Sequence, residues 1–370
     1  MKIHALVCEG VRNLAPLTLV PRARFNVFVG DNGQGKTNLL EAIFAVAALR
    51  SFRTAKLSDL IAFGATEAKL GARVAKDDLT RVYEVEISPG SRRVRLDGKA
   101  SRPLSRYFGG FNVVVFTPED LGLARGAPAD RRRFLDRGVF NLRPGYLATT
   151  SDYEKVLKQR NSVLRQVGQG GMSASRGEEM LSIYDGQLAQ LGVQVAQDRV
   201  RFLDVIRPAL LDAFAAITRT GREAGARYVS QAAGGTAADL EVLLRAGRAR
   251  DLATGSTHVG PHRDDLVLEL DGREAGSFAS QGQLRALMLA WKSAELAVLG
   301  RAHGDAPILL LDDVSSELDP SRNEYLFQHL AAQAGQCFIT TTAASHVLLS
   351  GDRADYLIHS GRIESGRIDE

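Results

Sequence analysis

A glycine-rich segment near the start of the chain has the residue types and the spacing that bind phosphate. Residues 30–37 are Gly-Asp-Asn-Gly-Gln-Gly-Lys-Thr, which fits the pattern G-x-x-x-x-G-K-[ST]. The backbone N–H groups of such a loop turn towards phosphate oxygens, the lysine reaches the β and γ phosphates, and the last hydroxyl faces Mg²⁺. An apolar run at 26–29 precedes the loop and a helix-forming run at 38–44 follows it, as the motif requires. We therefore predict a nucleoside triphosphate site formed by Gly30, Asp31, Asn32, Gly33, Gln34, Gly35, Lys36, Thr37 and Asn38.

Two adjacent carboxylates stand at the end of another apolar run. Residues 308–311 are Ile-Leu-Leu-Leu, and Asp312 and Asp313 follow them. A phosphate loop needs an acid on a neighbouring strand to hold Mg²⁺, so we expect Thr37 and Asp312 to bind the metal. Asp313 should point differently off the strand end and could polarise the attacking water. The predicted catalytic residues are Lys36, Asp312 and Asp313.

A third segment has the features of a helix start. Ser280 stands where an N-cap is expected and Gln283 follows three residues later, which is a capping box ahead of the helical pattern at 284–299. Capping alone would explain these two residues. A helix start with a glycine, Gly282, in its first turn and free N–H groups is also an anion site. Its position 32 residues before Asp312 favours that second interpretation.

The spacing of apolar residues predicts the elements that carry these segments. Continuous apolar runs at 26–29, 112–116, 308–311 and 337–340 are typical of parallel strands covered on both faces. Alternation over 83–87 and 93–96 around Pro89-Gly90 predicts an antiparallel hairpin. From 151 to 206 the period becomes helical, which predicts two antiparallel helices joined by a glycine-rich loop. We expect Pro208 to end the second helix and a further helix to run to about 248. The fold class is α/β.

Composition excludes some classes of protein. The chain has 370 residues, a net charge of +4 and 38 arginines against 9 lysines, and no apolar run approaches the roughly 20 residues of a membrane span. Its two cysteines exclude a disulfide framework, and no export signal is evident, so we expect a cytoplasmic protein. The segment 92–137 carries a local net charge of +6 and is the electrostatic candidate for contact with nucleic acid.

The order of these segments resembles the ABC-type ATPases. Phosphate loop, Ser-x-Gly-Gln helix start, apolar strand with paired acids and then Ser-Ser-Glu-Leu-Asp at 315–319 follow one another as in that superfamily. The resemblance implies that Ser280, Gly282 and Gln283 of one subunit close on the γ-phosphate of ATP held by the other, in an ATP-dependent homodimer with two composite sites.

Further stretches resemble the RecF family of recombination-mediator ATPases, relatives of the SMC and Rad50 proteins. They lie at 33–42, 50–53, 116–121, 131–136, 260–265 and 310–319, and so extend over nearly the whole chain. The resemblance implies an ABC-type ATPase head of mixed sheet and helices at 1–120 and 250–370, with a mostly helical arm inserted at 121–249. It also implies ATP and Mg²⁺ as cofactors, binding of duplex and gapped DNA, and cooperation with RecR and RecO in loading RecA.

Several residues depart from the wider superfamily. Asp313 stands where transport ATPases usually have the longer Glu, so we expect slow hydrolysis. Gln281 replaces a glycine, no Gln loop is obvious after Phe116, and threonines at 340–342 occupy the position of the switch histidine. His346, four residues beyond, is not a candidate.

Two groups of polar residues admit alternative interpretations. His258 and His262, with acids at 264 and 265, have the chemistry of metal ligands, but the Gly-Pro between them breaks any helix. We favour a loop near the nucleotide or the dimer interface over a zinc site. The candidates for DNA contact are Arg50, Arg53, Arg131, Arg132 and Arg133, for which a solvated helix surface, paired with acids at 130 and 136 in the second group, is about equally compatible.

The favoured function is an ATP-dependent DNA clamp, in which ATP drives dimerisation, the dimer grips duplex DNA and slow hydrolysis releases it. Three other functions compete with this clamp. A transporter ATPase subunit shares the composite site but normally has a conventional Ser-x-Gly-Gln segment and a Gln loop. A nuclease fused to such a head would need a catalytic domain for which the sequence after 319 is too short. A nucleotide-gated binding module that does not hydrolyse ATP differs only in turnover.

Overall fold

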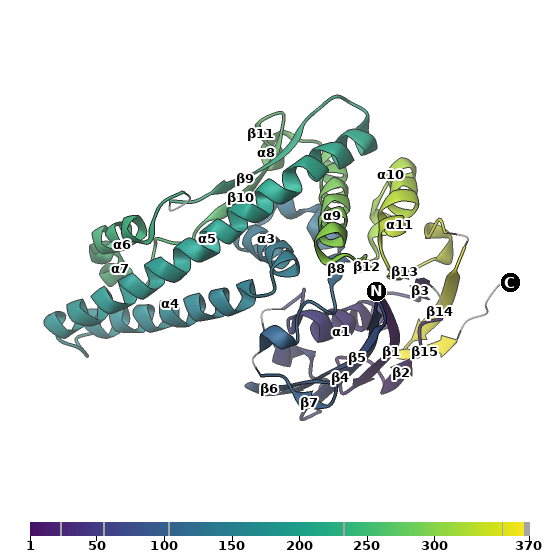
Figure 1. Ribbon diagram of the computed structural model, residues 1–370, viewed down its shortest axis with the longest axis horizontal. Coiled ribbons are helices and arrows are strands. Elements are labelled where there is room, and N and C mark those ends of the chain that lie inside the picture. The colour runs from purple at the N-terminus through teal and green to yellow at the C-terminus, as the bar shows by residue number, and fades with distance from the viewer. Residues whose placement is uncertain (23, 55, 103, 232–233, 350, 366–370) are drawn as a thin grey trace. The chain divides into compact units, whose positions relative to one another are not determined.

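The computed structural model of the chain describes residues 1–22, 24–54, 56–102, 104–231, 234–349 and 351–365 (Figure 1). The chain divides into two compact units. The first contains residues 1–122, 212–221 and 281–370, and the second contains residues 123–211 and 222–280. The sequence placed residues 250–280 with the head. They cluster with the second unit instead, because the strand at 265–270 pairs with the strand at 224–229.

The first unit contains a six-stranded sheet, and one of its strands leads directly into the phosphate loop. Its order is β15-β14-β3-β13-β12-β8, and its strands are β3 (Phe25–Val29), β8 (Val113–Phe116), β12 (Ile308–Asp312), β13 (Cys337–Thr341), β14 (Arg353–His359) and β15 (Arg362–Ser365). The pairs β12/β8, β12/β13, β13/β3 and β14/β3 are parallel, and only β15 is antiparallel. The predicted parallel strands are confirmed, and their near-complete burial explains why polar and apolar residues do not alternate.

The same unit contains a second, antiparallel sheet of six strands. Its strands are β1 (Lys2–Glu9), β2 (Leu17–Leu19), β4 (Ala68–Lys76), β5 (Leu79–Ser88), β6 (Ser91–Leu96) and β7 (Lys99–Ala100), in the order β2-β1-β4-β5-β6-β7. The predicted hairpin is confirmed, since Ser88 pairs with Ser91 across the two-residue turn. Residues at alternate positions of β4 and β5 are buried, so this sheet has one covered face.

Helices fill the space beside these sheets. The helix α1 (Lys36–Ala48) contacts strands of both sheets and is almost wholly buried, and α9 (Gln281–His303) is buried over most of its length. The shorter elements of the unit are η1 (Leu57–Leu60), η2 (Leu104–Arg106), α2 (Pro118–Leu121), η4 (Val314–Glu317), α10 (Pro320–Tyr325), η5 (Leu326–Leu330), α11 (Ala331–Gln333) and η6 (Ala344–His346).

The second unit is built on two long helices that run side by side (Figure 1). They are α4 (Tyr146–Gly168) and α5 (Ala174–Thr218), joined by the predicted glycine-rich loop. Around them lie η3 (Leu123–Arg125), α3 (Pro128–Leu142), α6 (Ala237–Ala246), α7 (Arg248–Thr254), α8 (Ala275–Phe278) and a sheet of β9 (Ala224–Val229), β10 (Asp265–Leu270) and β11 (Arg273–Glu274). The unit is therefore not purely helical. The last residues of α5, from 212, belong to the first unit.

The prediction that Pro208 ends a helix is wrong. The helix α5 is 45 residues long and contains Pro208 in its interior. Proline removes one N–H and frees the carbonyl of residue 204, which costs about 3 kcal/mol in a helix interior. Residues 204 and 208 are exposed, so water can bond the freed carbonyl. Phe202, Ile206 and Leu210 form a buried row on both sides of the proline, and their burial keeps the helix intact.

No helix within the described part of the chain is long and apolar enough to cross a membrane. Cys8 and Cys337 are free thiols, and burial raises the pKa of each to about 12. Both therefore remain protonated and unreactive near neutral pH.

Candidate nucleotide site

The phosphate loop connects the end of β3 to the start of α1, as predicted. Gly35 stands at the N-cap with a φ of 108°, a conformation that favours glycine. Lys36 begins the helix, and its Nζ donates to the backbone carbonyls of Gly30 at 2.6 Å and Asp31 at 2.9 Å. Burial lowers the pKa of Lys36, and the nearby carboxylates of Asp313, Asp312 and Asp31 oppose that effect. The backbone carbonyls and the nearby carboxylates thus hold the ammonium at the loop. A triphosphate would bind the ammonium more strongly than they do, because it carries more negative charge.

Residues far away in the sequence hold the loop in this shape. The side-chain amide of Asn13 donates to the carbonyl of Gly33 at 2.9 Å. The N–H of Gly361 donates to the carbonyl of Gln34 at 2.9 Å, and the N–H of Ser360 donates to the Gln34 side chain at 2.6 Å. Sequence reasoning missed Asn13 and the turn at 360–361, because nothing in their local pattern marks them as neighbours of the loop.

A methyl group at Gly30 would collide with β14. A Cβ at this position would lie only 2.3 Å from the carbonyl oxygen of Ile358. The loop therefore leaves β3 so close to the neighbouring strand that only a hydrogen fits there.

The predicted metal ligands lie together. The Thr37 hydroxyl donates to Oδ1 of Asp312 at 2.8 Å, and the Thr340 hydroxyl donates to the same oxygen at 2.8 Å. Burial raises the pKa of Asp312, while the two hydroxyl groups act in the opposite direction. A hydroxyl and a carboxylate oxygen in contact beside a phosphate loop fit Mg²⁺, which takes oxygen ligands and binds through one or two carboxylates plus phosphates. The cation would also relieve the cost of burying the Asp312 charge.

Asp313 differs in conformation from its neighbour. It has a φ of 50°, in the left-handed region, so the chain turns sharply after Asp312. Its N–H donates to the carbonyl and to the hydroxyl of Thr340, at 3.1 and 3.0 Å. Its Oδ1 is buried and, within the described residues, accepts no hydrogen bond. A buried carboxylate oxygen without a donor fits an atom that meets water or substrate during the reaction.

The helix α9 begins at Gln281, as the capping pattern predicts, and Ser280 precedes it with an exposed side chain. Gly282 and Gln283 are half-buried in its first turn. Arg285, one turn further on, forms an ion pair with Glu317 at 3.3 Å. The positions fit an anion-binding helix start, and the roles of Ser280, Gly282 and Gln283 remain predictions.

Arg50 and Arg53 follow the phosphate-loop helix, and an unpredicted carboxylate engages the second of them. Glu41 of α1 is fully buried and accepts two hydrogen bonds from Arg12, at 3.0 and 2.9 Å, and one from Arg53 at 3.4 Å. Arg53 also donates to the side chain of Asn38 at 2.8 Å. Arg50 is half-buried. The sequence interpretation overlooked Glu41 and Arg12, which anchor α1 to the segments on either side of it.

The arginine cluster of α3 lies in the second unit and is mostly paired. Arg131 makes a two-pronged contact with Asp265, and Arg132 donates to the backbone carbonyl of Asp264 at 2.8 Å. Arg133 forms an ion pair with Asp130 and keeps 64% of its side chain exposed. Of the three, Arg133 is the most available for another ligand.

The histidines that suggested a metal site have other partners. His258 Nδ1 contacts Asp251 at 2.9 Å, and His262 bonds Tyr153 at 2.7 Å and the carbonyl of Thr257 at 3.0 Å. Burial lowers the pKa of His262 to about 4. No group of three or more His, Cys, Asp or Glu among the described residues could hold a metal ion. Both histidines therefore have partners within the second unit, and the placement of their loop near the nucleotide or the dimer interface stays a prediction.

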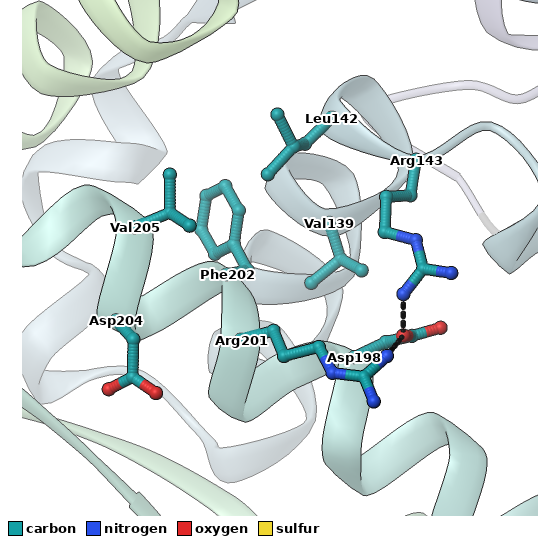
Figure 2. A pocket seen from close by; sticks show the side chains of 8 residues that line it. All are labelled: Val139, Leu142, Arg143, Asp198, Arg201, Phe202, Asp204 and Val205. Carbon is teal, nitrogen blue, oxygen red and sulfur yellow. Dashed lines mark hydrogen bonds and ion pairs between the residues drawn. The ribbon is translucent and has the colours of Figure 1, made fainter. Parts of the chain in front are cut away.

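A pocket of about 390 Å³ lies between α3 and α5 in the second unit (Figure 2). Figure 2 shows Val139, Leu142, Phe202 and Val205 gathered at its centre, with charged side chains beside them. Arg143 and Arg201 both pair with Asp198. None of the predicted site residues lines this pocket, and its apolar floor is unsuited to a triphosphate.

Comparison with known proteins agrees with the phosphate-loop geometry. The family model described as RecF/RecN/SMC N terminal domain matches residues 2–360. The chain is 40% identical to the DNA replication and repair protein RecF of Myxococcus xanthus over 98% of this chain and 97% of that protein. It is also 40% identical to that of Geobacter sulfurreducens over 95% of each chain.

Solved structures share the fold of this chain. A structure of the recombination mediator protein RecF with ATP, in the RecFOR pathway, has a TM-score of 0.87 and 29% identity, covering 99% of this chain and 97% of that chain. An Smc head has a TM-score of 0.55 at 16% identity, which shows a shared fold. The predicted α/β class and P-loop ATPase fold are therefore confirmed. The family model and the full-length relatives together show that this chain belongs to the RecF family.

Proposed function

We propose that this chain is an ATP-dependent recombination mediator. It dimerises on ATP, binds duplex DNA near single-strand gaps and, with RecO and RecR, helps to load RecA recombinase. The observation that carries the proposal is the contact of Thr37 with Asp312 beside the phosphate loop, in a chain related along its length to proteins named for DNA replication and repair. A cytoplasmic location is part of the proposal.

ATP binding draws on the residues of the loop. Lys36 leaves the carbonyls of Gly30 and Asp31 to meet the β and γ phosphates, and the N–H groups at the start of α1 bind phosphate oxygens. Mg²⁺, held by Thr37 and Asp312, would neutralise charge that develops on the phosphates. Asp313 orients the attacking water. Its side chain is one methylene shorter than Glu, so turnover is slow, and DNA stimulates it.

Dimerisation follows from the position of the anion-binding helix start. Ser280, Gly282 and Gln283 meet the γ-phosphate bound to a second copy of the chain. ADP lacks that phosphate, so it does not support the dimer. Hydrolysis therefore limits the lifetime of the dimer on DNA.

DNA contact depends on arginines that are not held in buried or two-pronged ion pairs. Arg133, whose ion pair with Asp130 is exposed, and Arg50 fit this role better than Arg131, whose guanidinium is held by two oxygens of Asp265. If Arg133 contacts a phosphate, Arg133→Ala should weaken binding of all duplex sequences and reduce the salt slope by about one. An unchanged salt slope would remove Arg133 from the interface.

The short Asp313 side chain also favours a second candidate, a nucleotide-gated DNA-binding module that does not hydrolyse ATP. The two differ in one measurement. Phosphate release above that of Lys36→Met supports the ATPase, and release equal to that of the variant supports the module.

The primary test is molar mass by light scattering. ATP with Mg²⁺ should double the mass, ADP should not, and a short gapped duplex should co-migrate with the dimer. Lys36→Met should abolish the ATP-driven dimer, whereas Ser280→Arg should bind ATP as a monomer and fail to dimerise. Equal loss of ATP binding in the Ser280 variant would contradict the composite site. A dimer that ignores DNA at low salt would contradict the DNA-binding part.

A further inference from the structure

Buried polar atoms without partners concentrate in one part of the first unit. The described residues contain nine such side-chain atoms, and five of them follow β12 or β13. They are Asp313 Oδ1, Ser315 Oγ, Arg322 Nε, Asn323 Oδ1 and His346 Nδ1. Buried polar groups are nearly always hydrogen-bonded in finished structures. This concentration indicates a region that gains partners when a ligand or a second subunit is bound.

The short helix α10 connects three parts of this region. Asp319 caps its N-terminus by accepting from the N–H of Arg322 at 3.1 Å. The Asn323 side-chain amide donates to the carbonyl of His346 at 3.0 Å. Tyr325 approaches the hydroxyl of Ser293 in α9 at 3.4 Å. One turn of helix thus links the segment after β12, the segment after β13 and the helix α9.

Arg322 brings this link to the start of α9. Its guanidinium pairs with Asp319, and its Nη2 would lie 3.3 Å from a methyl group placed on Gly282. The guanidinium therefore packs against the backbone of the first turn, where the absence of a side chain leaves room for it. Arg285, one turn further on, is paired with Glu317, so both arginines join α9 to the segment after β12.

At its other end, the link reaches the predicted metal site. Thr340 in β13 donates to Asp312 at 2.8 Å and accepts from the N–H of Asp313 at 3.0 Å. The chain leaves β13 at Thr341 and reaches His346 five residues later. A shift of β13 against the acid pair would be transmitted through the carbonyl of His346 to Asn323.

We infer that Arg322 and Asn323 are positioning residues that couple a subunit's own nucleotide site to its Ser280–Gln283 segment. The inference rests on the proposed function, in which that segment closes over the partner's nucleotide. Asn323 moves with the segment after β13, to which its side chain is bonded. Arg322 holds the first turn of α9 in the orientation that the second subunit requires.

The test separates ATP binding by the monomer from dimerisation. Arg322→Ala and Asn323→Ala are compared with Glu324→Ala, a matched control on the same helix whose side chain accepts a hydrogen bond from the exposed Gln328. Binding of a fluorescent ATP analogue, measured at protein concentrations too low for dimers, should stay within about twofold of wild type in all three variants. The dimer dissociation constant in ATP and Mg²⁺, from analytical ultracentrifugation, should rise about tenfold or more in the first two only, as expected for a loss of about 1.4 kcal/mol.

A double-mutant cycle tests whether Arg322 acts through Gly282. Gly282→Ala places a methyl group against the guanidinium, so its effect on dimerisation should be at least about threefold smaller when Arg322 is already Ala. Arg322→Lys keeps the charge beside Asp319 but not the planar group, and should fall between wild type and Arg322→Ala. Arg322→Lys and Gly282→Ala serve as the test if the alanine variants do not fold.

Three results would overturn the inference: wild-type dimerisation in Arg322→Ala, additive effects in the cycle, or loss of monomer ATP affinity in step with dimerisation. A wild-type chain that never dimerises in ATP would instead overturn the proposed function. The two failures are therefore distinguishable.

Discussion

A fully buried arginine in the second unit gives the most quantitative prediction. Arg160 of α4 has no exposed surface and donates to Asp185 at 2.6 Å, to Asp251 at 2.7 Å and to Thr257 at 2.7 Å. It thereby ties α4 to α5, to α7 and to the segment after α7. Replacing it by Met keeps an unbranched side chain as long as the arginine stem up to Nε and removes the charged end of the guanidinium.

The expected loss of stability depends on the partners that Asp185 and Asp251 keep when Arg160 is removed. Breaking a buried ion pair by removing one partner typically costs about 3–5 kcal/mol, because the other charge stays buried. Asp185 would keep Arg248 at 2.7 Å, and Asp251 would keep two contacts with His258, at 3.1 and 2.9 Å. The loss should therefore lie at the lower end, about 3 kcal/mol in the free energy of unfolding of the second unit.

The assay is urea unfolding, with hydrogen exchange in α4 and α5 to assign the transition to the second unit. Arg245→Met is the control, since its ion pair with Glu241 is exposed on one helix face and should be worth about 0.3–0.5 kcal/mol. ATP binding should be unchanged in both variants, because the phosphate loop lies in the first unit. An Arg160→Met loss below about 1 kcal/mol would refute the reasoning, because the buried charges would then have found other compensation.

Three further predictions concern the site and the pH dependence. Asp312→Asn should stabilise the nucleotide-free chain at neutral pH, since burial raises the pKa of Asp312 and the ionised form is therefore costly; it should also lower phosphate release far more than ATP affinity. Thermal melting without nucleotide and steady-state turnover check this, and a lower melting midpoint would contradict it. Gly30→Ala should weaken ATP binding at least tenfold, an expected loss of about 1.4 kcal/mol, because the methyl group meets the Ile358 carbonyl and the loop must shift; wild-type affinity by calorimetry would show that the loop tolerates a side chain. The pKa of His262 is about 4 in the folded chain against about 6.5 when unfolded, so protonation favours unfolding, and stability should fall as the pH drops from about 6.5 to about 4, by up to about 3 kcal/mol. His262→Gln should flatten that part of the profile in urea unfolding, and an unchanged slope would exclude His262 as its origin.

Local pattern was sufficient to predict the elements that surround the phosphate loop. The apolar runs at 26–29 and 308–311 became β3 and β12, and Thr37 and Asp312 met as expected. Such runs are informative because a strand covered on both faces must be apolar throughout. At Pro208 the local pattern led to a wrong prediction, because tertiary packing overrode it. A proline is a strong local signal, and burial of Phe202, Ile206 and Leu210 outweighed it.

Long-range partners lay beyond local reasoning. Asn13, Ser360 and Gly361 hold the phosphate loop, although they lie 20 residues or more from their partners in sequence. No periodicity links these positions, and a single polar residue in a loop has no distinctive signature. The expected boundary between head and arm at residue 250 differs from the observed division of the chain for the same reason, because β10 pairs with a strand about 40 residues earlier.

The sequence by itself determined a phosphate loop after a buried strand and an acid pair at the end of another, and it predicts an anion-binding helix start between them in the chain. These follow from residue types and short spacings, which encode local backbone geometry and charge. The tertiary structure decided which polar groups meet. It pairs Arg131 with Asp265 and His262 with Tyr153, and it joins Arg322 and Asn323 to α9 and to the segment after β13. Such pairings are set by packing of elements distant in sequence, where the burial of many apolar side chains outweighs the preference of any single residue.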